Sequence, residues 1–229
     1  MKKPKLLVVG SFVMDLIVST EIFPNSGETV LGKKFQTAPG GKGANQAVQA
    51  AKLGAEVTMV GKVGNDAFGR ELTGSAKAAG IDVSHVAVSQ EEASAIGNIL
   101  LEVEEGKKSR NRIIVVPGAN MAIRPEDVEF LREEIGKYDM VLLQLEIPMA
   151  INELVAGLAH EKGVPVMLNS APYAPLPEEL LRHVTYLSPN EHEAASLTGI
   201  PIRSGKDGVN REDVTAAVRA LQAKGVKNV

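Results

Sequence analysis

The stretch Pro39-Gly40-Gly41-Lys42-Gly43-Ala44-Asn45-Gln46 lies between a strand that ends near Ala38 and a helix predicted over residues 43–53. Its glycines let the backbone approach a ligand, and a helix N-terminus favours negative charge. Spacing excludes two common nucleotide loops: no Ser or Thr follows Lys42, as in a Walker A loop, and Gln46 stands where a dinucleotide fingerprint needs Gly or Ala. Lys42 and Asn45 can both face one small, hydroxyl-bearing ligand, but a solvated Lys and a helix-capping Asn explain them equally well.

On both sides of this stretch, short apolar runs alternate with segments of helical period. We expect strands at residues 5–9, 56–60, 139–145, 164–168 and 184–187, and helices at 43–53, 66–79, 124–135, 149–162, 177–182 and 211–224. This alternation is typical of a parallel sheet with helices on both faces. The sequence therefore predicts a three-layer α/β fold with a mostly parallel sheet.

Four further segments resemble the strands of hairpins and interrupt the alternation. They span residues 12–20, 30–37, 95–103 and 111–116, and Glu104-Glu105-Gly106-Lys107-Lys108 is the clearest turn between them. A small sheet inserted in an α/β domain needs a partner for its apolar face, so it would serve as a lid over a site or as a dimer contact. Alternatively, these strands extend the main sheet. We predict one incomplete α/β domain over residues 1–229, with lid strands inserted at these positions.

Composition favours a small-molecule partner. The 229 residues carry a net charge of −3 without blocks of like charge, which argues against nucleic acid and anionic membranes. No apolar run reaches the ~18 residues of a membrane span, and we expect a cytoplasmic protein. Cysteine is absent, and the four histidines show no metal-ligand spacing. Because Val226–Val229 begins a strand that the chain does not complete, we expect a truncated protein.

Several motifs, in the same order along the chain, resemble those of the ribokinase family of sugar and nucleoside kinases. They are Gly10-Ser11-x-x-x-Asp15, Gly27-Glu28-Thr29-Val30, residues 39–47, Gly61-x-Val63-Gly64-x-Asp66-x-x-Gly69, Gly118-Ala119-Asn120, Gln144-x-Glu146-x-Pro148 and Pro189-Asn190-Glu191-x-Glu193. Together with Asn169-x-Ala171-Pro172, they are more similar to ribokinases than to fructokinases or adenosine kinases. The resemblance covers essentially the whole chain.

The resemblance implies a sugar-binding site. Its members would be Asp15, Gly41, Lys42, Gly43, Asn45 and Glu146. Asp15 lies on an otherwise apolar strand and Glu146 ends a buried one, so each carboxylate needs a partner, which sugar hydroxyls or a structural ion pair would supply. One position departs from the family: Val13 stands where a polar residue, commonly Asn, is usual. Val13 either contributes only its backbone or marks a shifted substrate preference.

The resemblance also implies a phosphate side of the site. Asn190 would bind the nucleotide, and Glu193 would bind Mg²⁺ directly or through water. The same residues would equally start a helix, with Asn190 as its cap. ATP would be the co-substrate, and a monovalent cation such as K⁺ is expected to bind residues beyond this chain. The lid strands suggest a homodimer.

The family's second glycine-rich signature, Asp-Thr-x-Gly-Ala-Gly-Asp, does not occur in the 229 residues. By resemblance its last Asp is the catalytic base, which we therefore expect beyond Val229. We expect the parent protein to phosphorylate D-ribose to ribose 5-phosphate with magnesium ATP, and the 229-residue chain alone to be inactive. The alternatives are a kinase of another sugar or nucleoside, and a non-catalytic sugar-binding or assembly module.

Overall fold

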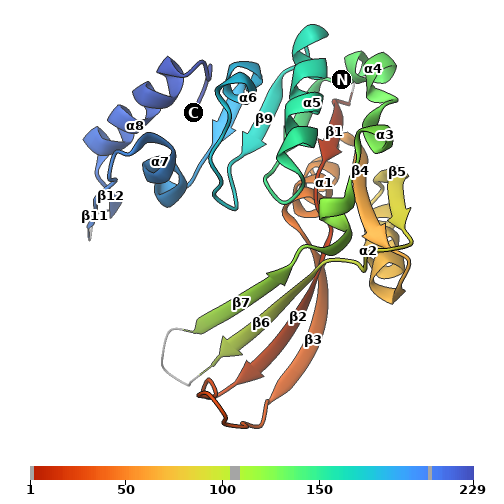
Figure 1. Ribbon diagram of the computed structural model, residues 1–229, viewed down its shortest axis with the longest axis vertical. Coiled ribbons are helices and arrows are strands. Elements are labelled where there is room, and N and C mark those ends of the chain that lie inside the picture. Colours follow the sequence, from red (N-terminus) through yellow and green to blue (C-terminus); the bar gives the residue numbers. More distant parts are fainter. Residues whose placement is uncertain (1–2, 104–108, 206–207) are drawn as a thin grey trace.

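A six-stranded parallel sheet in the order β10-β9-β8-β1-β4-β5 forms the centre of the molecule (Figure 1). Its strands are β1 (Lys5–Val9), β4 (Glu56–Gly64), β5 (Asp82–Ser89), β8 (Met140–Leu143), β9 (Val166–Asn169) and β10 (Tyr186–Ser188). The computed structural model describes residues 3–103, 109–205 and 208–229. The mostly parallel, layered α/β architecture predicted from the sequence is confirmed.

Helices cover both faces of this sheet. They are α1 (Lys42–Lys52), α2 (Ala67–Ala78), α3 (Pro125–Val128), α4 (Leu131–Glu134), α5 (Met149–Glu161), α6 (Glu178–His183), α7 (Glu191–Thr198) and α8 (Arg211–Ala223), with 3₁₀ turns η1 (Gly118–Ala122) and η2 (Ile135–Lys137). Because side chains alternate along a strand, Leu7 and Val9 of β1 pack in the core under α3 to α6, whereas Val8 packs under α1 and α2. In the described part of the chain no helix combines the length and the apolar character needed to cross a membrane.

A second sheet of four strands projects from the main domain (Figure 1). It has the order β3-β2-β6-β7, with β2 (Val13–Thr20), β3 (Lys34–Gly40), β6 (Ile96–Glu102) and β7 (Arg110–Val116). Only the β2–β6 pair is parallel. A short pair, β11 (Ser204–Gly205) and β12 (Gly208–Val209), lies before α8. We call the four-stranded sheet the lid.

Strand β3 of the lid begins later than predicted. Residues 30–33 are not in a strand, because β2 ends at Thr20 and the antiparallel register pairs Ser19 with Lys34. Lys33 is opposite Thr20, and its amide still donates to the Ser19 carbonyl at 2.7 Å, but the residues before Lys33 lie beyond the end of β2. The predicted turn at residues 104–108 lies outside the described residues.

Two other differences concern the main domain. The single helix predicted over residues 124–135 is divided into α3, α4 and η2, and at the break the amide of Arg132 bonds to the carbonyl of Glu129, one residue short of the α-helical spacing. Strand β5 was not predicted. It is an edge strand, and polar residues such as Asp82, Ser84 and His85 interrupt its apolar pattern.

Candidate functional site

The site lies where the chain leaves the main sheet for the lid. After β1 the chain runs through residues 10–12 into β2, and residues 144–147 follow the neighbouring strand β8. The sheet order continues from β1 to β4 on one side and to β8 on the other, and such a switch point is where α/β sheets bind ligands.

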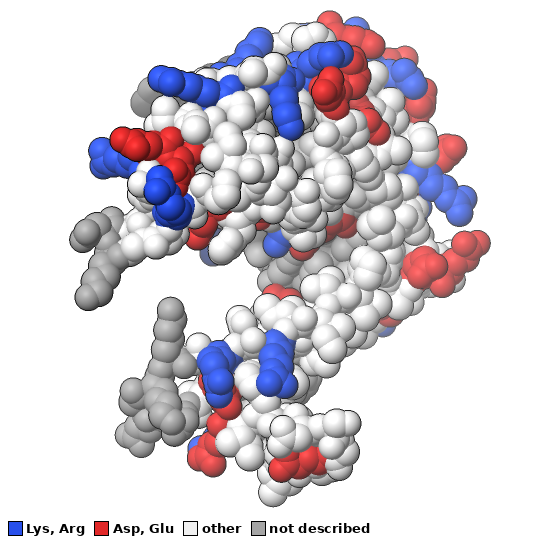
Figure 2. Space-filling view, turned by 60° about the vertical axis from the view of Figure 1, so that its left-hand side comes forward, with Lys and Arg blue, Asp and Glu red and all other residues white. Residues whose placement is uncertain are grey.

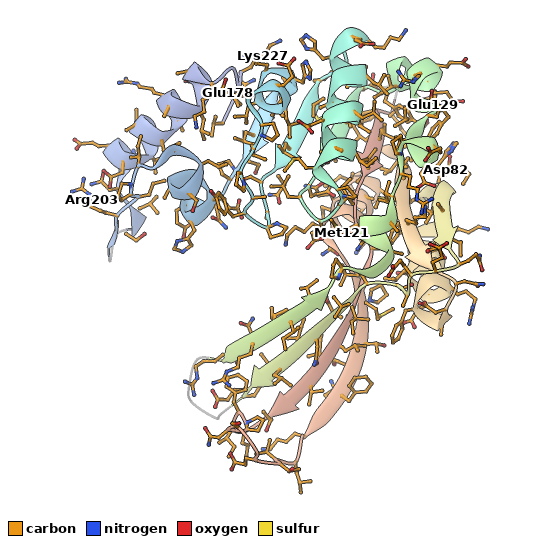
Figure 3. The ribbon with its side chains drawn as sticks, in the orientation of Figure 1. Asp82, Met121, Glu129, Glu178, Arg203 and Lys227 are labelled. Atoms are coloured by element: carbon orange, nitrogen blue, oxygen red, sulfur yellow. The ribbon has the colours of Figure 1, made fainter. Side chains whose placement is uncertain are left out.

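A cavity of about 480 Å³ occupies this place. It is lined by Val13, Lys42, Ile113, Val115, Pro117, Asn120, Met121, Leu145, Glu146 and Pro172. Figure 2 shows the molecule hollowed between the main domain and the lid, and in Figure 3 Met121 lies where the two parts join. The structure thus brings Lys42 and Glu146, more than a hundred residues apart in sequence, to one cavity.

Glu146 is tied to two separate segments. Its Oε2 accepts hydrogen bonds from the Ser11 hydroxyl at 2.5 Å and from the Lys42 backbone amide at 2.8 Å. Its Oε1 lies 3.6 Å from Lys42 Nζ. The Glu146 side chain is 17% exposed and that of Lys42 is 38% exposed, so the pair is fixed on the protein side and still reachable from the cavity.

The backbone amides at the N-terminus of α1 donate hydrogen bonds to oxygen atoms of the protein itself. Beside the amide of Lys42, the amide of Gly43 donates to Ser11 Oγ at 3.2 Å and that of Ala44 to the Ser11 carbonyl at 2.9 Å. The first turn of α1 holds no acidic residue, so Glu146 supplies the negative charge that a helix N-terminus favours. The first turn of α1 therefore holds the Glu146 carboxylate in place.

The glycines allow this close packing. Gly41 has φ of 97°, and a Cβ on it would lie 2.8 Å from the Ser11 carbonyl oxygen. A Cβ on Gly43 would lie 2.5 Å from the Ser11 amide nitrogen. Both residues bring the loop against the chain that follows β1, where a side chain has no room. Whether their amides contact a sugar stays a prediction.

Asp15 lies on β2 in a space that two glycines leave open. A Cβ on Gly97 would lie 2.5 Å from Asp15 Oδ1, and one on Gly40 would lie 2.8 Å from Oδ2. Burial raises the pKa of the Asp15 carboxyl, the negative charge of Glu146 raises it further, and Lys42 partly offsets both. No donor among the described residues is hydrogen-bonded to this carboxylate, which leaves it free to accept bonds from ligand hydroxyls.

Asn45 does not cap α1, contrary to one interpretation of its position. The N-cap residue is Gly41, which has no side chain, and the first-turn amides are bonded instead by Glu146 and Ser11 from other segments. The Asn45 side chain is exposed, and its backbone amide donates to the Gly41 carbonyl at 2.8 Å. Its contact with a sugar stays a prediction.

Asn190 and Glu193 form a capping box at the start of α7, as the helix-cap interpretation predicts. Asn190 Oδ1 accepts from the Glu193 amide at 2.8 Å, Asn190 Nδ2 donates to Glu193 Oε1 at 2.9 Å, and Ser170 Oγ donates to Glu193 Oε2 at 2.9 Å. Within the described residues no group of three metal-ligating side chains is assembled. Glu193 is 7% exposed and already bonded at both oxygens, so its geometry fits Mg²⁺ better through a water molecule than directly.

Two residues were missed as members of the site. Ser11 is fully buried and links Glu146 to α1. Asn120 accepts from the Phe12 amide at 3.0 Å and donates to the Phe12 carbonyl at 2.8 Å, which fixes the backbone next to Val13. A hydroxyl two residues after an apolar strand was the available signal for Ser11. The partner of Asn120 lies 108 residues away, and no local pattern identifies it.

Comparison with known proteins shows which family the chain is similar to. The family model described as "pfkB family carbohydrate kinase" matches residues 3–229. The chain is 47% identical over 192 residues to the ribokinase of Bacillus subtilis, which covers 84% of the chain and 64% of that protein. It is 33% identical over 225 residues to the deoxyribokinase of Salmonella typhi, which covers 98% of the chain and 70% of that protein. A solved structure titled as Arabidopsis thaliana ribokinase complexed with ribose and ATP superposes with a TM-score of 0.85 at 36% identity, over 99% of this chain and 70% of that one.

Proposed function

The chain belongs to the pfkB family of carbohydrate kinases, and we propose that its protein phosphorylates D-ribose at the terminal hydroxyl with ATP, giving ribose 5-phosphate. The observation that carries this proposal is the grouping of Asp15, Lys42 and Glu146 at the switch point of the sheet. Similarity to ribokinases, one of them solved with ribose and ATP, supports the choice of both substrates.

The three side chains suit a small polyol. The carboxylates of Asp15 and Glu146 accept hydrogen bonds from hydroxyls, and the Lys42 ammonium donates them. Ser11 and the first turn of α1 already hold Glu146, so the acceptor is in place before the sugar binds and little entropy is lost in positioning it. The lid beside the cavity would exclude water from the bound sugar.

The phosphate side of the site would involve two residues at the start of α7. We propose that Asn190 lies near the nucleotide and that Glu193 contacts Mg²⁺ through water; the ion would neutralise phosphate charge when bound. Activation by K⁺ also stays a proposal. Because the family's second glycine-rich signature does not occur among the 229 residues, we propose that they bind sugar without turnover, and an assay of ADP release with ribose tests this point.

Removal of the Lys42 ammonium is the direct test of the sugar site. Lys42→Ala should weaken ribose binding by about 10-fold or more, because a hydrogen bond to a charged group is worth about 1.5–3 kcal/mol. Isothermal titration of the 229-residue chain with ribose measures this. Lys52→Ala is the matched control, since Lys52 lies in the last turn of the same helix. Equal affinities for both variants would contradict the assignment.

A different sugar or a nucleoside is the second candidate substrate. It is favoured by the largely apolar lining of the cavity and by the similarity to a deoxyribokinase. Titration with a panel of pentoses, hexoses and nucleosides separates this candidate from ribose.

A cytoplasmic location also stays a prediction.

The lid exposes apolar side chains that a second copy of the chain would cover. Ile113, Ile114, Val115 and Val116 of β7 are each more than half exposed, and Phe35 of β3 is 63% exposed. We propose a homodimer through the lid, because uncovered apolar sheet faces need a partner. Ile114→Lys should convert dimer to monomer in light scattering after size exclusion. Val88→Lys on β5, where Val88 is 52% exposed, should leave the dimer intact; a wild-type monomer would refute the proposal.

A further inference from the structure

We propose that Gln144 is a positioning residue of the sugar site. Its buried carboxamide holds the first turn of α1 against the chain that follows β1, and this contact sets where Lys42 and Glu146 meet the cavity. Because Gln144 is fully buried, it acts on a sugar only through these two residues. The inference rests on the proposed function, since sugar binding at the cavity is one of its readouts.

Gln144 joins three elements of the main domain. It directly follows β8 and lies two residues before Glu146. Its Nε2 donates to Oε1 of Gln46 on α1 at 2.6 Å, and its backbone carbonyl accepts from Nδ2 of Asn152 on α5 at 2.9 Å. Gln46 lies four residues after Lys42, so the two side chains lie on the same side of the helix. The hydrogen bond from Gln144 to Gln46 therefore fixes the rotation of the turn that carries Lys42.

The carboxamide oxygen of Gln144 fills the space that a side chain at Gly10 would need. A Cβ on Gly10 would lie 1.9 Å from Gln144 Oε1 and 3.0 Å from the Cα of Gly43. Gly10 follows β1 and Gly43 belongs to the first turn of α1, so the carboxamide lies where these two segments meet. Ser11, the next residue after Gly10, donates to Glu146 and accepts from the Gly43 amide. A displaced carboxamide would therefore shift the contact that holds Glu146.

Stability alone does not explain a polar side chain at this place. Gln144 and Asn152 are both fully buried, and in the described part of the chain no donor bonds to Gln144 Oε1 or to Asn152 Oδ1. A buried acceptor without a donor costs more free energy than one neutral hydrogen bond returns, and an apolar side chain of the same shape avoids that cost. Proteins keep such groups where a site needs a fixed geometry. Here the hydrogen bond to Gln46 gives α1 that geometry.

The experiment separates ribose affinity from stability in the 229-residue chain. Gln144→Met keeps the length of the side chain but removes the unpaired acceptor and the bond to Gln46, whose partly exposed oxygen can bond to water instead. The melting temperature should equal or exceed that of the wild type, whereas ribose affinity in calorimetry should fall about 10-fold, an ordinary coupling within one hydrogen-bond network. Gln49→Met is the matched control, because Gln49 is an exposed carboxamide on the same helix and should change neither quantity.

A second variant tests whether the hydrogen bond itself carries the effect. Gln46→Met removes the same bond and leaves Gln144 Nε2 buried without an acceptor, so it should lower both ribose affinity and the melting temperature. Combining it with Gln144→Met should weaken binding no further than Gln144→Met alone, because side chains that act through one bond are not additive. The amide resonance of Lys42 in heteronuclear NMR reports its bond to Glu146 without any sugar present. It should shift in both variants and stay in place in Gln49→Met.

Each other outcome overturns a defined part of the proposal. Unchanged affinity and an unchanged Lys42 resonance in Gln144→Met would refute the positioning role. A loss of affinity with an equal loss of stability in Gln144→Met and Gln46→Met would mean that the carboxamide is structural. Additive losses in the double variant would refute the shared bond. If the wild-type chain binds no ribose, the proposed function fails, whereas the Lys42 resonance still decides whether Gln144 positions the turn. If Gln144→Met does not fold, an unchanged Lys42 resonance in Gln46→Met would refute the proposal.

Discussion

Replacing Glu146 with alanine is expected to weaken sugar binding by about 100-fold and to destabilise the fold. The substitution removes the acceptor for the Ser11 hydroxyl and for the Lys42 amide, and it leaves the Lys42 ammonium without its counter-charge. Loss of one partner from a largely buried charged network costs about 3 kcal/mol. For a chain of this size that corresponds to a fall of about 6–12 °C in the melting temperature.

Thermal unfolding and ribose calorimetry measure the two effects separately. Affinity should fall by about 100-fold, since a charged acceptor for the sugar is lost and α1 is no longer fixed against the loop after β1. Glu161→Ala is the control, because Glu161 ends the nearby helix α5 and is exposed. A Glu146→Ala variant with the melting temperature of the control would show that the network does not stabilise the fold.

The sequence was sufficient for those features that local patterns encode. Short, nearly continuous apolar runs predicted those strands of the main sheet that are buried on both faces, such as β1 and β8. Strand β5 was missed because it lies at the edge and carries polar residues. The division of α3 from α4, where the Arg132 amide bonds to the Glu129 carbonyl, was also missed.

For the site, the residue types were predictable but their connections were not. The motif containing Lys42 indicated a ligand-binding turn, and its spacing excluded standard phosphate loops. Glu146 accepts a hydrogen bond from the Lys42 amide in that turn, and this contact joins residues 104 positions apart in the chain. Asn190 and Glu193 illustrate the converse, since a local capping box accounts for their hydrogen bonds and the sequence predicted it.

Replacing Asp15 with asparagine is expected to weaken ribose binding by about 10- to 100-fold while raising thermal stability at neutral pH. Burial and the neighbouring Glu146 raise the pKa of Asp15 above its ordinary value of 3.8, so the folded protein disfavours its charged form. Above the raised pKa the carboxylate is ionised in both states and destabilises the folded one. The neutral amide of the variant removes that penalty.

The pH dependence separates this explanation from a general effect of losing a carboxylate. As pH falls through the raised pKa of Asp15, the wild-type protein is protonated first in its folded state, so the advantage of Asp15→Asn should shrink and be lost below about pH 3.8. Asp82 is the matched control of opposite sign, because a hydrogen bond from the Ser84 amide lowers the pKa of its carboxyl. Asp82→Asn should therefore destabilise the protein at neutral pH, with ribose affinity unchanged, and because the folded-state pKa of Asp82 lies below 3.8 its deficit should begin to shrink only below about pH 3.8. Melting curves of both variants between pH 7 and pH 3.5 measure this contrast. Parallel changes in the two variants would mean that the folded protein does not disfavour the charged form of Asp15. They would also contradict the proposal that this carboxylate is available to accept hydrogen bonds from sugar hydroxyls.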